Sequence, residues 1–283
     1  MKPTPAISEA DVQRVSANGA TEHFGDALAV EEPLEIRLGF ERDGRREHKA
    51  ISITMRTPGD DESLAIGFLF TEGIIKRPEQ IAAVRHCGIP SADKGIRNTI
   101  RVDLADGVDV DLKRLERHFY TTSSCGVCGK SSIEALQTGA AKLEDQGFFV
   151  SSEVIHRLPE SGIASQSTFE KTGGLHASVI FDVNGKIETV AEDVGRHNAL
   201  DKVIGNKFMS GDLPLSKSIL LVSGRASFEL VQKSLMAGIP MMAAVGAPSS
   251  LAVELAGEFG MTLIGFVRDG RFNIYTGKFR VMS

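Results

Sequence analysis

The chain has 283 residues, of which 42% are hydrophobic and 24% are charged, which is enough for about two domains with apolar cores. Its formal net charge of −5 argues against a protein that binds nucleic acid or anionic membranes without specificity. The sequence shows no apolar run of membrane-helix length and no hydrophobic leader, so we expect a cytoplasmic protein with no membrane contact and no nucleic acid partner.

The first part of the chain is rich in predicted strands. Residues 1–32 are polar and aperiodic, so we expect a mobile tail there. Apolar residues then alternate in Leu34–Phe40 and in Ile51–Met55, and the Asp-Gly turn between these segments predicts an antiparallel hairpin. We further expect a helix over 60–73, a short helix over 78–84 and a strand over 96–104. These elements predict a small α+β domain over 33–120.

Strands and helices alternate in the last part of the chain. Asn184-Gly185 lies between strand-like segments over 177–181 and 187–191, which is a strong hairpin signal. The following elements are predicted as helices over 199–209, 227–237 and 251–259 and as strands over 219–222, 241–245, 262–266 and 272–275. This order is typical of a three-layer α/β/α domain with parallel strands. We assign that domain to 171–283.

Two of the three cysteines, Cys125 and Cys128, lie between these parts in a run of small residues. A capping box over 131–134 predicts that a helix begins just after them and ends near residue 143, and a helical piece is expected over 154–158. We group the cysteine loop, this helix and the connecting segment as 121–170. The cysteines therefore precede a predicted helix N-terminus.

The cysteine pair allows several interpretations. Structural zinc needs four ligands and the sequence has no second pair, so we predict no metal, apart from a half-site shared across a homodimer. A thioredoxin-type dithiol would follow a strand in a compact unit, whereas this pair lies on a long loop. An accidental pair of small residues is the plainest alternative.

A sulfur carrier is the remaining interpretation of the pair. Its thiolate needs a lowered pKa, which a helix N-terminus and Lys130 would supply, and it needs reach, which Gly126 and Gly129 would supply. The second cysteine would either release the product by forming a disulfide or relay the sulfur. Glycines beside both cysteines pack poorly in a core, which favours a chemical role.

Candidate binding residues are expected where the strands of the last domain end. Segment 192–198 places acid, base, imidazole and amide groups at a helix start. A charged helix cap is the alternative interpretation, but a cap alone needs only one polar residue, so this segment favours a ligand site. Turns 223–227 and 246–250 place small residues at helix starts suited to phosphate, with an arginine as a forked donor. The predicted cofactor-binding residues here are His176, Asp193, Arg196, His197, Ser223, Arg225 and Gly246.

A last candidate is the turn over 266–271, with an aromatic residue and two arginines. This segment is interpreted either as an exposed hairpin turn or as a binding site. In the second case the arginines bind pyrophosphate and the aromatic ring stacks on a flat ligand. Its residues are Phe266, Val267, Arg268, Asp269, Gly270 and Arg271.

Several motifs occur together over most of the chain. They are Cys125-Gly126-Val127-Cys128, Gly174-Leu175-His176-Ala177, Glu192-Asp193-Val194-Gly195-Arg196-His197, Ala199-Leu200-Asp201-Lys202, Arg225-Ala226-Ser227, Val231-Gln232-Lys233-Ser234 and Leu251-Ala252-Val253-Glu254. In this combination the sequence resembles the formate dehydrogenase accessory sulfurtransferase family (FdhD).

The resemblance implies a sulfur carrier protein that is required for formate dehydrogenase activity. It would accept sulfur from a cysteine desulfurase as a persulfide on Cys125, with Cys128 as partner. The acceptor would be the molybdenum cofactor, bis-molybdopterin guanine dinucleotide, before its insertion into formate dehydrogenase. Segment 266–271 matches the family's cofactor-binding segment, and GDP is a possible mimic of the cofactor.

The resemblance also implies a homodimer and a cytidine deaminase-like C-terminal domain. Zinc deaminases of that fold place His or Cys ligands at two helix starts, but the corresponding segments here, 196–198 and 225–227, contain no cysteine, which disfavours a deaminase. Two other functions remain open, namely a non-catalytic cofactor chaperone and a dithiol redox protein.

Overall fold

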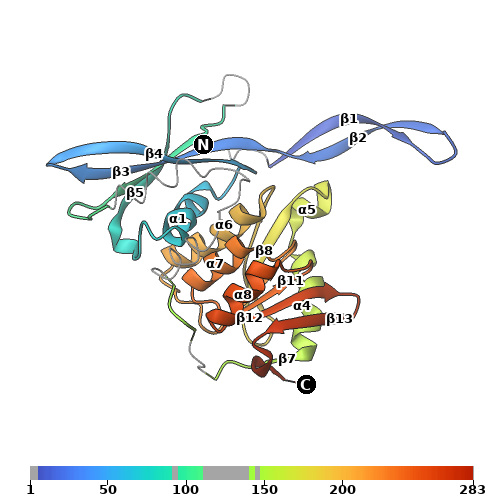
Figure 1. Cartoon of the computed structure of the whole chain (residues 1–283). Helices are drawn as coiled ribbons and strands as arrows, with labels where there is room; N and C mark the ends of the chain where they lie inside the picture. The colour runs from blue at the N-terminus through green and yellow to red at the C-terminus, as the bar shows by residue number, and fades with distance from the viewer. Residues whose placement is uncertain (1–5, 91–94, 111–139, 144–146, 283) are drawn as a thin grey trace.

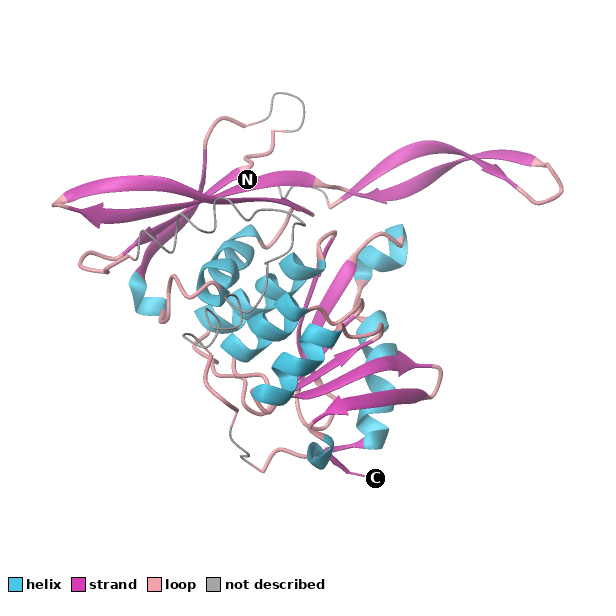
Figure 2. Cartoon of the chain, viewed as in Figure 1, coloured by secondary structure: helices cyan, strands magenta, loops and turns pink. Residues whose placement is uncertain are grey.

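A computed structural model describes residues 6–90, 95–110, 140–143 and 147–282. A four-stranded sheet with a projecting two-stranded arm lies on one side of the molecule, and a six-stranded sheet lies on the other, with helices between them (Figures 1 and 2). Cys125 and Cys128 lie outside the described residues. None of the helices in the described ranges has both the length and the apolarity needed to span a membrane.

The four-stranded sheet has the order β4-β3-β6-β5, and helix α1 covers one of its faces. The strands are β3 (Glu32–Arg42), β4 (Arg45–Arg56), β5 (Ile81–Cys87) and β6 (Thr99–Leu104), and α1 spans Asp61–Thr71. The predicted hairpin, the predicted first helix and the strand expected over 96–104 are thereby confirmed. Alternate residues of β3, from Leu34 to Leu38, pack against Leu64 and Leu69 of α1, which explains the period-two pattern.

The helix predicted over 78–84 is wrong. Only Pro78–Gln80 forms a single 3₁₀ turn, η1, and the chain then enters β5. Proline at the first helical position favoured a helix, but Val84 instead pairs with Val102 of β6. Pairing with a distant strand therefore overrides the local signal.

The expectation of an aperiodic tail over 1–32 is also wrong where the structure describes it. Strands β1 (Ile7–Val15) and β2 (Thr21–Ala29) pair in nine-residue antiparallel register and project from the body as an arm (Figure 1). Most of their residues are exposed, and the Arg14 guanidinium lies 4.2 Å from the centre of the Phe24 ring. Such a mainly polar ribbon gave no apolar alternation from which to predict it.

The six-stranded sheet has the order β13-β12-β11-β10-β8-β9, in which β10, β11 and β12 run parallel and the other strands run antiparallel to their neighbours. The strands are β8 (His176–Phe181), β9 (Ile187–Asp193), β10 (Ile219–Val222), β11 (Met241–Ala244), β12 (Thr262–Arg268) and β13 (Arg271–Thr276). Each was predicted from the sequence to within three residues.

Helices cover both faces of this sheet. One apolar core joins it to α6 (Arg196–Met209), α7 (Phe228–Met236) and α8 (Ser250–Glu258), and another joins its opposite face to α4 (Ser152–Ala164). These helices confirm the predicted alternation and the helical piece over 154–158. Residues 140–143 are not helical, so the expected end of the preceding helix near 143 is wrong.

Four smaller elements complete the described chain. Helix α5 (Ser167–Thr172) precedes β8, and β7 (Val150–Ser151) pairs in parallel with β14 (Val281–Met282), which follows the 3₁₀ helix η2 (Lys278–Arg280). None of these elements was predicted.

Helices α1 and α6 cross at two glycines and so join the two sheets. A Cβ atom on Gly67 would overlap the carbonyl oxygen of Asp201, and one on Gly205 would overlap that of Ser63. The backbones approach this closely only because both side chains are absent. The position of α6, which begins beside the predicted binding residues, is therefore fixed by the N-terminal part of the chain. The predicted domain boundaries stay a prediction.

Candidate functional site

The predicted binding residues of the C-terminal part meet at one edge of the six-stranded sheet. The parallel strands β10, β11 and β12 all end there, and antiparallel β8 begins there at His176, which pairs with Asp193 at the end of β9. Backbone bonds link neighbouring strand ends, since Gly246 N donates to Gly224 O at 3.0 Å and Phe266 N donates to Gly246 O at 3.1 Å. This edge lies outside carboxyl ends of parallel strands, where open α/β sheets bind ligands.

Ser223, Arg225 and Gly246 form the centre of the edge. Ser223 donates its backbone N–H to Ala177 O at 3.0 Å and accepts the Ala177 N–H through Oγ at 2.9 Å, so its hydroxyl is engaged in joining β10 to β8. The exposed Arg225 runs its stem beside Gly246, where an added Cβ atom would lie 3.1 Å from Arg225 Cγ. Its guanidinium is therefore available at the edge for an anionic ligand.

His176 lies against Gly224 and Arg196. A Cβ atom on Gly224 would be 3.4 Å from His176 Nδ1 and 4.0 Å from Arg196 Cδ. Burial lowers the pKa of His176, the charges of Arg196 and His197 lower it further, and Asp193 acts in the opposite direction. The imidazole is therefore held neutral near pH 7, so that it can accept or donate a proton at the edge.

His197 joins the starts of α6 and α7. Its Nε2 lies 2.8 Å from Glu229 Oε2 and 3.3 Å from Ser227 Oγ, and Ser227 also caps α7 through the Leu230 N–H. The hydrogen bond from His197 is the main reason that the pKa of Glu229 is lowered. Through Nε2, His197 thus joins two helix starts.

Asp193 does not face solvent. Its side chain is fully buried, and it accepts hydrogen bonds from Gly195 N at 2.8 Å, Thr57 N at 3.2 Å and Asn198 Nδ2 at 3.0 Å, with Lys202 Nζ 2.8 Å away. Four donors fill both carboxylate oxygens, so Asp193 holds the turn before α6 in place. Its predicted contact with a ligand stays a prediction.

The turn over 266–271 ends β12 and begins β13 with an irregular register. Phe266 is half-buried and has φ of 54°, a left-handed conformation that is strained for a bulky residue and that occurs preferentially at functional sites. The Arg268 guanidinium lies 5.7 Å from the Phe266 ring centre, while Arg268, Asp269, Gly270 and Arg271 are exposed. Val267 is 1% exposed and packs in the core on the α4 side of the sheet, so only its backbone is available to a ligand.

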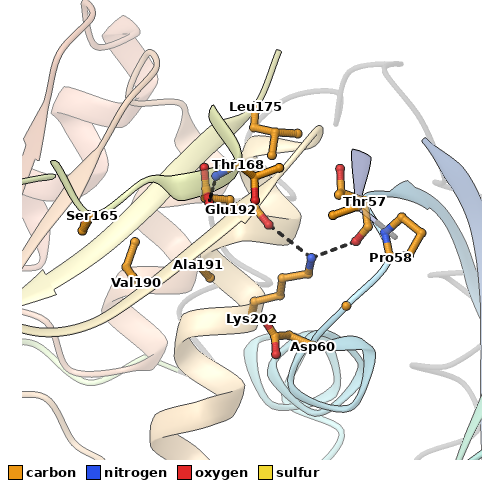
Figure 3. Close-up of a pocket in the computed structure, with 12 residues that line it drawn as sticks. Thr57, Pro58, Asp60, Ser165, Thr168, Leu175, Val190, Ala191, Glu192 and Lys202 are labelled. Carbon is orange, nitrogen blue, oxygen red and sulfur yellow. Dashed lines mark hydrogen bonds between the residues drawn. The ribbon is translucent and has the colours of Figure 1, made fainter. Parts of the chain in front are cut away.

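A pocket of about 280 Å³ lies beside the edge, between the loop after β4 and strand β9 (Figure 3). Lys202 lines it and donates to Thr57 O at 3.0 Å and to Glu192 O at 3.2 Å. The Glu192 carboxylate accepts the N–H groups of Thr168 and Phe169 at 3.0 and 2.7 Å.

Sequence reasoning missed Thr57, Thr168 and Lys202 at this pocket. Lys202 lay inside a quoted motif, but its partners are separated from it by up to 145 residues. No local pattern identifies such contacts.

Cys125 and Cys128, the predicted catalytic pair, lie outside the described residues. Within the described ranges, no three His, Cys, Asp or Glu side chains gather as the ligands of a metal ion would. The predicted absence of a metal stays a prediction.

Comparisons with known proteins place this geometry in context. Residues 29–282 match the model of the FdhD/NarQ family. The chain is 48% identical over 267 residues to the sulfur carrier protein FdhD of Streptomyces coelicolor, covering 93% of this chain and 92% of that one. It is 44% identical to the protein of the same name from Anaeromyxobacter dehalogenans, covering 96% and 93%.

A solved structure has the same fold. It is a crystal structure described as a formate dehydrogenase accessory protein from Desulfotalea psychrophila, with a TM-score of 0.73 and 25% identity. The match covers 98% of this chain and 100% of that one. The two chains therefore share their fold over nearly their whole lengths.

Proposed function

Because the chain belongs to the FdhD/NarQ family, we propose that it is a sulfur carrier that serves formate dehydrogenase. The observation that carries this proposal is the 48% identity, over 93% of the chain, to a protein named as a sulfur carrier. Formate dehydrogenase is proposed as the enzyme served because the structural relative is described as its accessory protein.

The proposed donor is a cysteine desulfurase. In this step the Cys125 thiolate attacks the terminal sulfur of the donor's persulfide, a Cys125 persulfide forms and the donor thiolate leaves. Once the acceptor is bound, attack by the Cys128 thiolate on Cys125 Sγ would form a disulfide and release hydrosulfide to the acceptor, so that sulfur and electrons balance. The chain in this role is a sulfurtransferase.

The proposed acceptor is the molybdenum cofactor with two guanine dinucleotide arms, bound as substrate at the sheet edge. Exposed Arg225, Arg268 and Arg271 offer forked donors for its phosphates, and the strained Phe266 offers a ring for stacking. Gly224 and Gly246, which lack a Cβ atom, let the backbone pack closely against the side chains of His176 and Arg225 at this edge. GDP is the corresponding test ligand.

We also propose that the C-terminal part has the cytidine deaminase-like arrangement. The strand order β9-β8-β10-β11-β12, with helices on both faces, supports this assignment. The starts of α6 and α7, where zinc deaminases carry metal ligands, are joined here by the His197–Ser227 contact.

A homodimer in the cytoplasm completes the proposal. Apolar side chains are exposed on the arm, at Val15 and Leu28, and on the outer strand β4, at Ile53 and Met55. A two-stranded ribbon is only marginally stable alone, which favours its burial against a second copy. Light scattering across a dilution series tests this point, and a monomer at every concentration would contradict it.

The proposed function is tested first in cells. We expect Cys125→Ala to abolish formate dehydrogenase activity in a strain that depends on this chain, while the purified variant binds GDP as the wild type does. Full activity of Cys125→Ala would overturn the carrier role. Loss of sulfur transfer with retained cofactor delivery would favour the non-catalytic chaperone. A Cys125–Cys128 disulfide that forms without any desulfurase, with no persulfide when the desulfurase is present, would favour the dithiol redox protein.

The proposed binding edge is tested by calorimetry with GDP. Arg225→Ala removes a charge-assisted contact of about 1.5–3 kcal/mol, so we expect GDP affinity to fall by roughly tenfold or more. Arg157→Ala on α4 removes an exposed arginine from the other face of the sheet and is the matched control. Equal affinity of Arg225→Ala and Arg157→Ala would contradict the assignment of the edge.

A further inference from the structure

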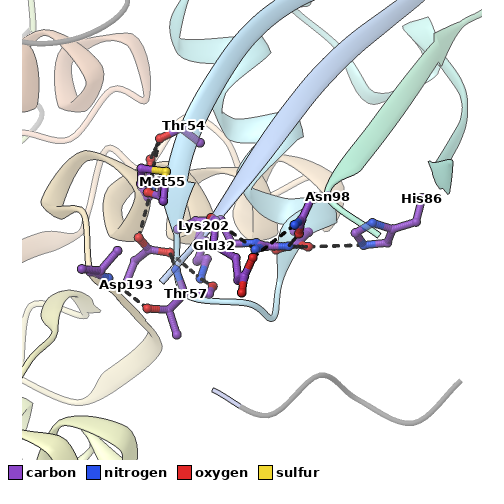
Figure 4. Close-up of polar contacts among 12 residues, drawn as sticks. Glu32, Thr54, Met55, Thr57, His86, Asn98, Asp193 and Lys202 are labelled. Atoms are coloured by element: carbon purple, nitrogen blue, oxygen red, sulfur yellow. Dashed lines mark hydrogen bonds and ion pairs between the residues drawn. The ribbon is translucent and has the colours of Figure 1, made fainter. Parts of the chain in front are cut away.

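Two segments that are far apart in the sequence are joined directly behind the binding edge. Residues 54–57 at the end of β4 belong to the N-terminal sheet, and residues 193–202 form the turn and first helical turns that carry Arg196 and His197. Figure 4 shows Thr54, Met55 and Thr57 close to Asp193 and Lys202, to which Thr57 is hydrogen-bonded. The contact therefore connects the N-terminal sheet to the residues at the start of α6.

Asn198 makes three hydrogen bonds within this contact. Its Nδ2 donates to Met55 O at 2.7 Å and to Asp193 Oδ1 at 3.0 Å, while its Oδ1 accepts from Thr54 Oγ1 at 3.0 Å. The residue is 7% exposed, so water does not replace a lost partner without rearrangement. An amide is required here, because one end of the side chain faces two acceptors and the other faces a donor.

Thr57 fixes the same turn through its backbone and side chain. Its N–H donates to Asp193 Oδ2 at 3.2 Å, its carbonyl accepts from Lys202 Nζ at 3.0 Å, and its Oγ1 accepts from Val194 N at 3.2 Å. Together with Asn198, these bonds hold the backbone on both sides of Arg196 and His197. Arg196 lies between these two sets of bonds, and its Nε is buried without a hydrogen-bond partner in the described part of the chain.

We propose that Asn198 is a positioning residue through which the end of β4 sets the orientation of Arg196 and His197 at the binding edge. This inference rests on the proposed function, because the ligand at the edge is taken to be the guanine nucleotide part of the cofactor. Asn198 itself is buried and does not contact the ligand. Its effect on binding passes through the turn before α6.

A second buried contact between the two parts of the molecule provides a control. Thr71 Oγ1 of α1 donates to Asp201 Oδ1 at 3.0 Å and also lies 2.9 Å from Lys233 Nζ. Thr71→Val keeps the shape of the side chain but removes these bonds, without touching residues 193–198. It therefore weakens the association of the N-terminal and C-terminal parts at a different place, between α1 and α6.

The test compares Asn198→Ala, Asn198→Asp and Thr71→Val in the full chain. Asn198→Asp preserves the shape but turns a carboxylate oxygen toward Met55 O and Asp193, so it remains informative if the alanine variant folds poorly. Three quantities are measured, namely the thermal midpoint, the GDP affinity and the pKa of His176 by NMR without ligand, with His176→Gln used to assign the signal.

We expect both Asn198 variants to weaken GDP binding at least tenfold and to raise the pKa of His176 toward its usual range. The pKa responds because burial, Arg196 and His197 lower it, so that a displaced Arg196 and greater hydration would relieve that shift, while Asp193 remains the opposing charge. Thr71→Val should lower the thermal midpoint to a similar extent and leave both other quantities unchanged.

The proposal is overturned if the Asn198 variants match Thr71→Val in GDP affinity and His176 titration at equal loss of stability. Asn198 would then only hold the fold together. If the wild-type chain binds no guanine nucleotide, the proposed ligand is wrong, and the His176 titration still decides whether Asn198 positions the start of α6.

Discussion

Two buried ion pairs join α6 to its surroundings, and they differ in how each aspartate is supported. Lys202 Nζ lies 2.8 Å from Asp193 Oδ2, and Lys233 Nζ lies 2.9 Å from Asp201 Oδ2. Asp193 also accepts three other hydrogen bonds, two of them from backbone N–H groups. Asp201 has only Thr71 Oγ1 besides its lysine, as far as the described residues show.

This difference separates two tasks within one interface. The Asp193 network fixes a backbone turn, because most of its donors belong to that turn or to the end of β4. The Asp201 network joins three side chains from α1, α6 and α7 and so acts as a clamp between helices. Burial tends to lower the pKa of Lys233, but the charges of Asp201 and Glu72 outweigh it and raise the pKa. Lys233 therefore stays charged within the clamp.

Lys233→Met should have the largest effect on stability. It leaves Asp201 buried with one neutral donor, and it removes the cation 3.6 Å from Glu72. Removing one partner of a buried pair destabilises by about 3–5 kcal/mol, and we expect the upper end of that range in urea unfolding. A loss comparable to that of an exposed surface substitution would show that the clamp is unimportant.

Lys202→Met should destabilise the chain less but disturb the binding edge more. Asp193 keeps three donors after this change, so we expect the lower end of about 3–5 kcal/mol. GDP affinity should nevertheless fall, because the turn that carries Arg196 loses one of its supports, whereas Lys233→Met should keep the affinity of the wild type. If calorimetry shows weaker GDP binding for Lys233→Met than for Lys202→Met, the Asp193 network does not have the role of holding the turn at the binding edge.

His176 offers a smaller effect that depends on pH. The pKa of His176 is lowered in the folded chain. The contribution of its neutral imidazole to the free energy of unfolding is therefore present above the usual pKa of about 6.5 and is lost as pH falls through the lowered folded value. The wild type should therefore lose stability between about pH 7 and pH 5, and His176→Gln should lose less over the same interval. Equal slopes of urea midpoint against pH for the two proteins would contradict a buried neutral imidazole.

Removal of residues 1–29 should have the smallest effect on unfolding of the body. The arm touches the body mainly where β2 meets α5. Just after α5, a Cβ atom added to Gly174 would lie 3.7 Å from the Cβ atom of Ala29. We expect nearly the same urea midpoint for the two proteins under conditions where each is monomeric. A large loss of stability would show that the arm belongs to the core of the fold rather than to its surface.

The strand and helix order of the C-terminal part could be predicted because its signals are local. Buried runs such as Ile219–Val222 are followed by serine caps such as Ser227 and Ser249, whose hydroxyls accept the N–H groups of Leu230 and Ala252. The gathering of His176, Ser223, Gly246 and Phe266 at one edge followed from that order, since parallel strands end together.

The remaining features depend on contacts between distant residues. The arm is held by pairing of two mainly polar strands, β5 is a strand because it pairs with β6, and Asp193 is buried because Thr57 and Lys202 surround it. The positioning role of Asn198 likewise arises from partners more than 140 residues away. None of these relations leaves a periodic or motif-like trace in the sequence.

The central claim, that the chain carries sulfur on Cys125, is tested most directly by mass spectrometry. The purified chain is incubated with a cysteine desulfurase and cysteine and is then digested and analysed without reductant. We predict an added mass of one sulfur atom, about 32 Da, on the peptide that contains Cys125, formed as a persulfide. The adduct should be absent in Cys125→Ala and retained in Cys87→Ala, which removes the described free cysteine on β5. Absence of the adduct from wild-type Cys125 under conditions in which the desulfurase turns over would contradict the account.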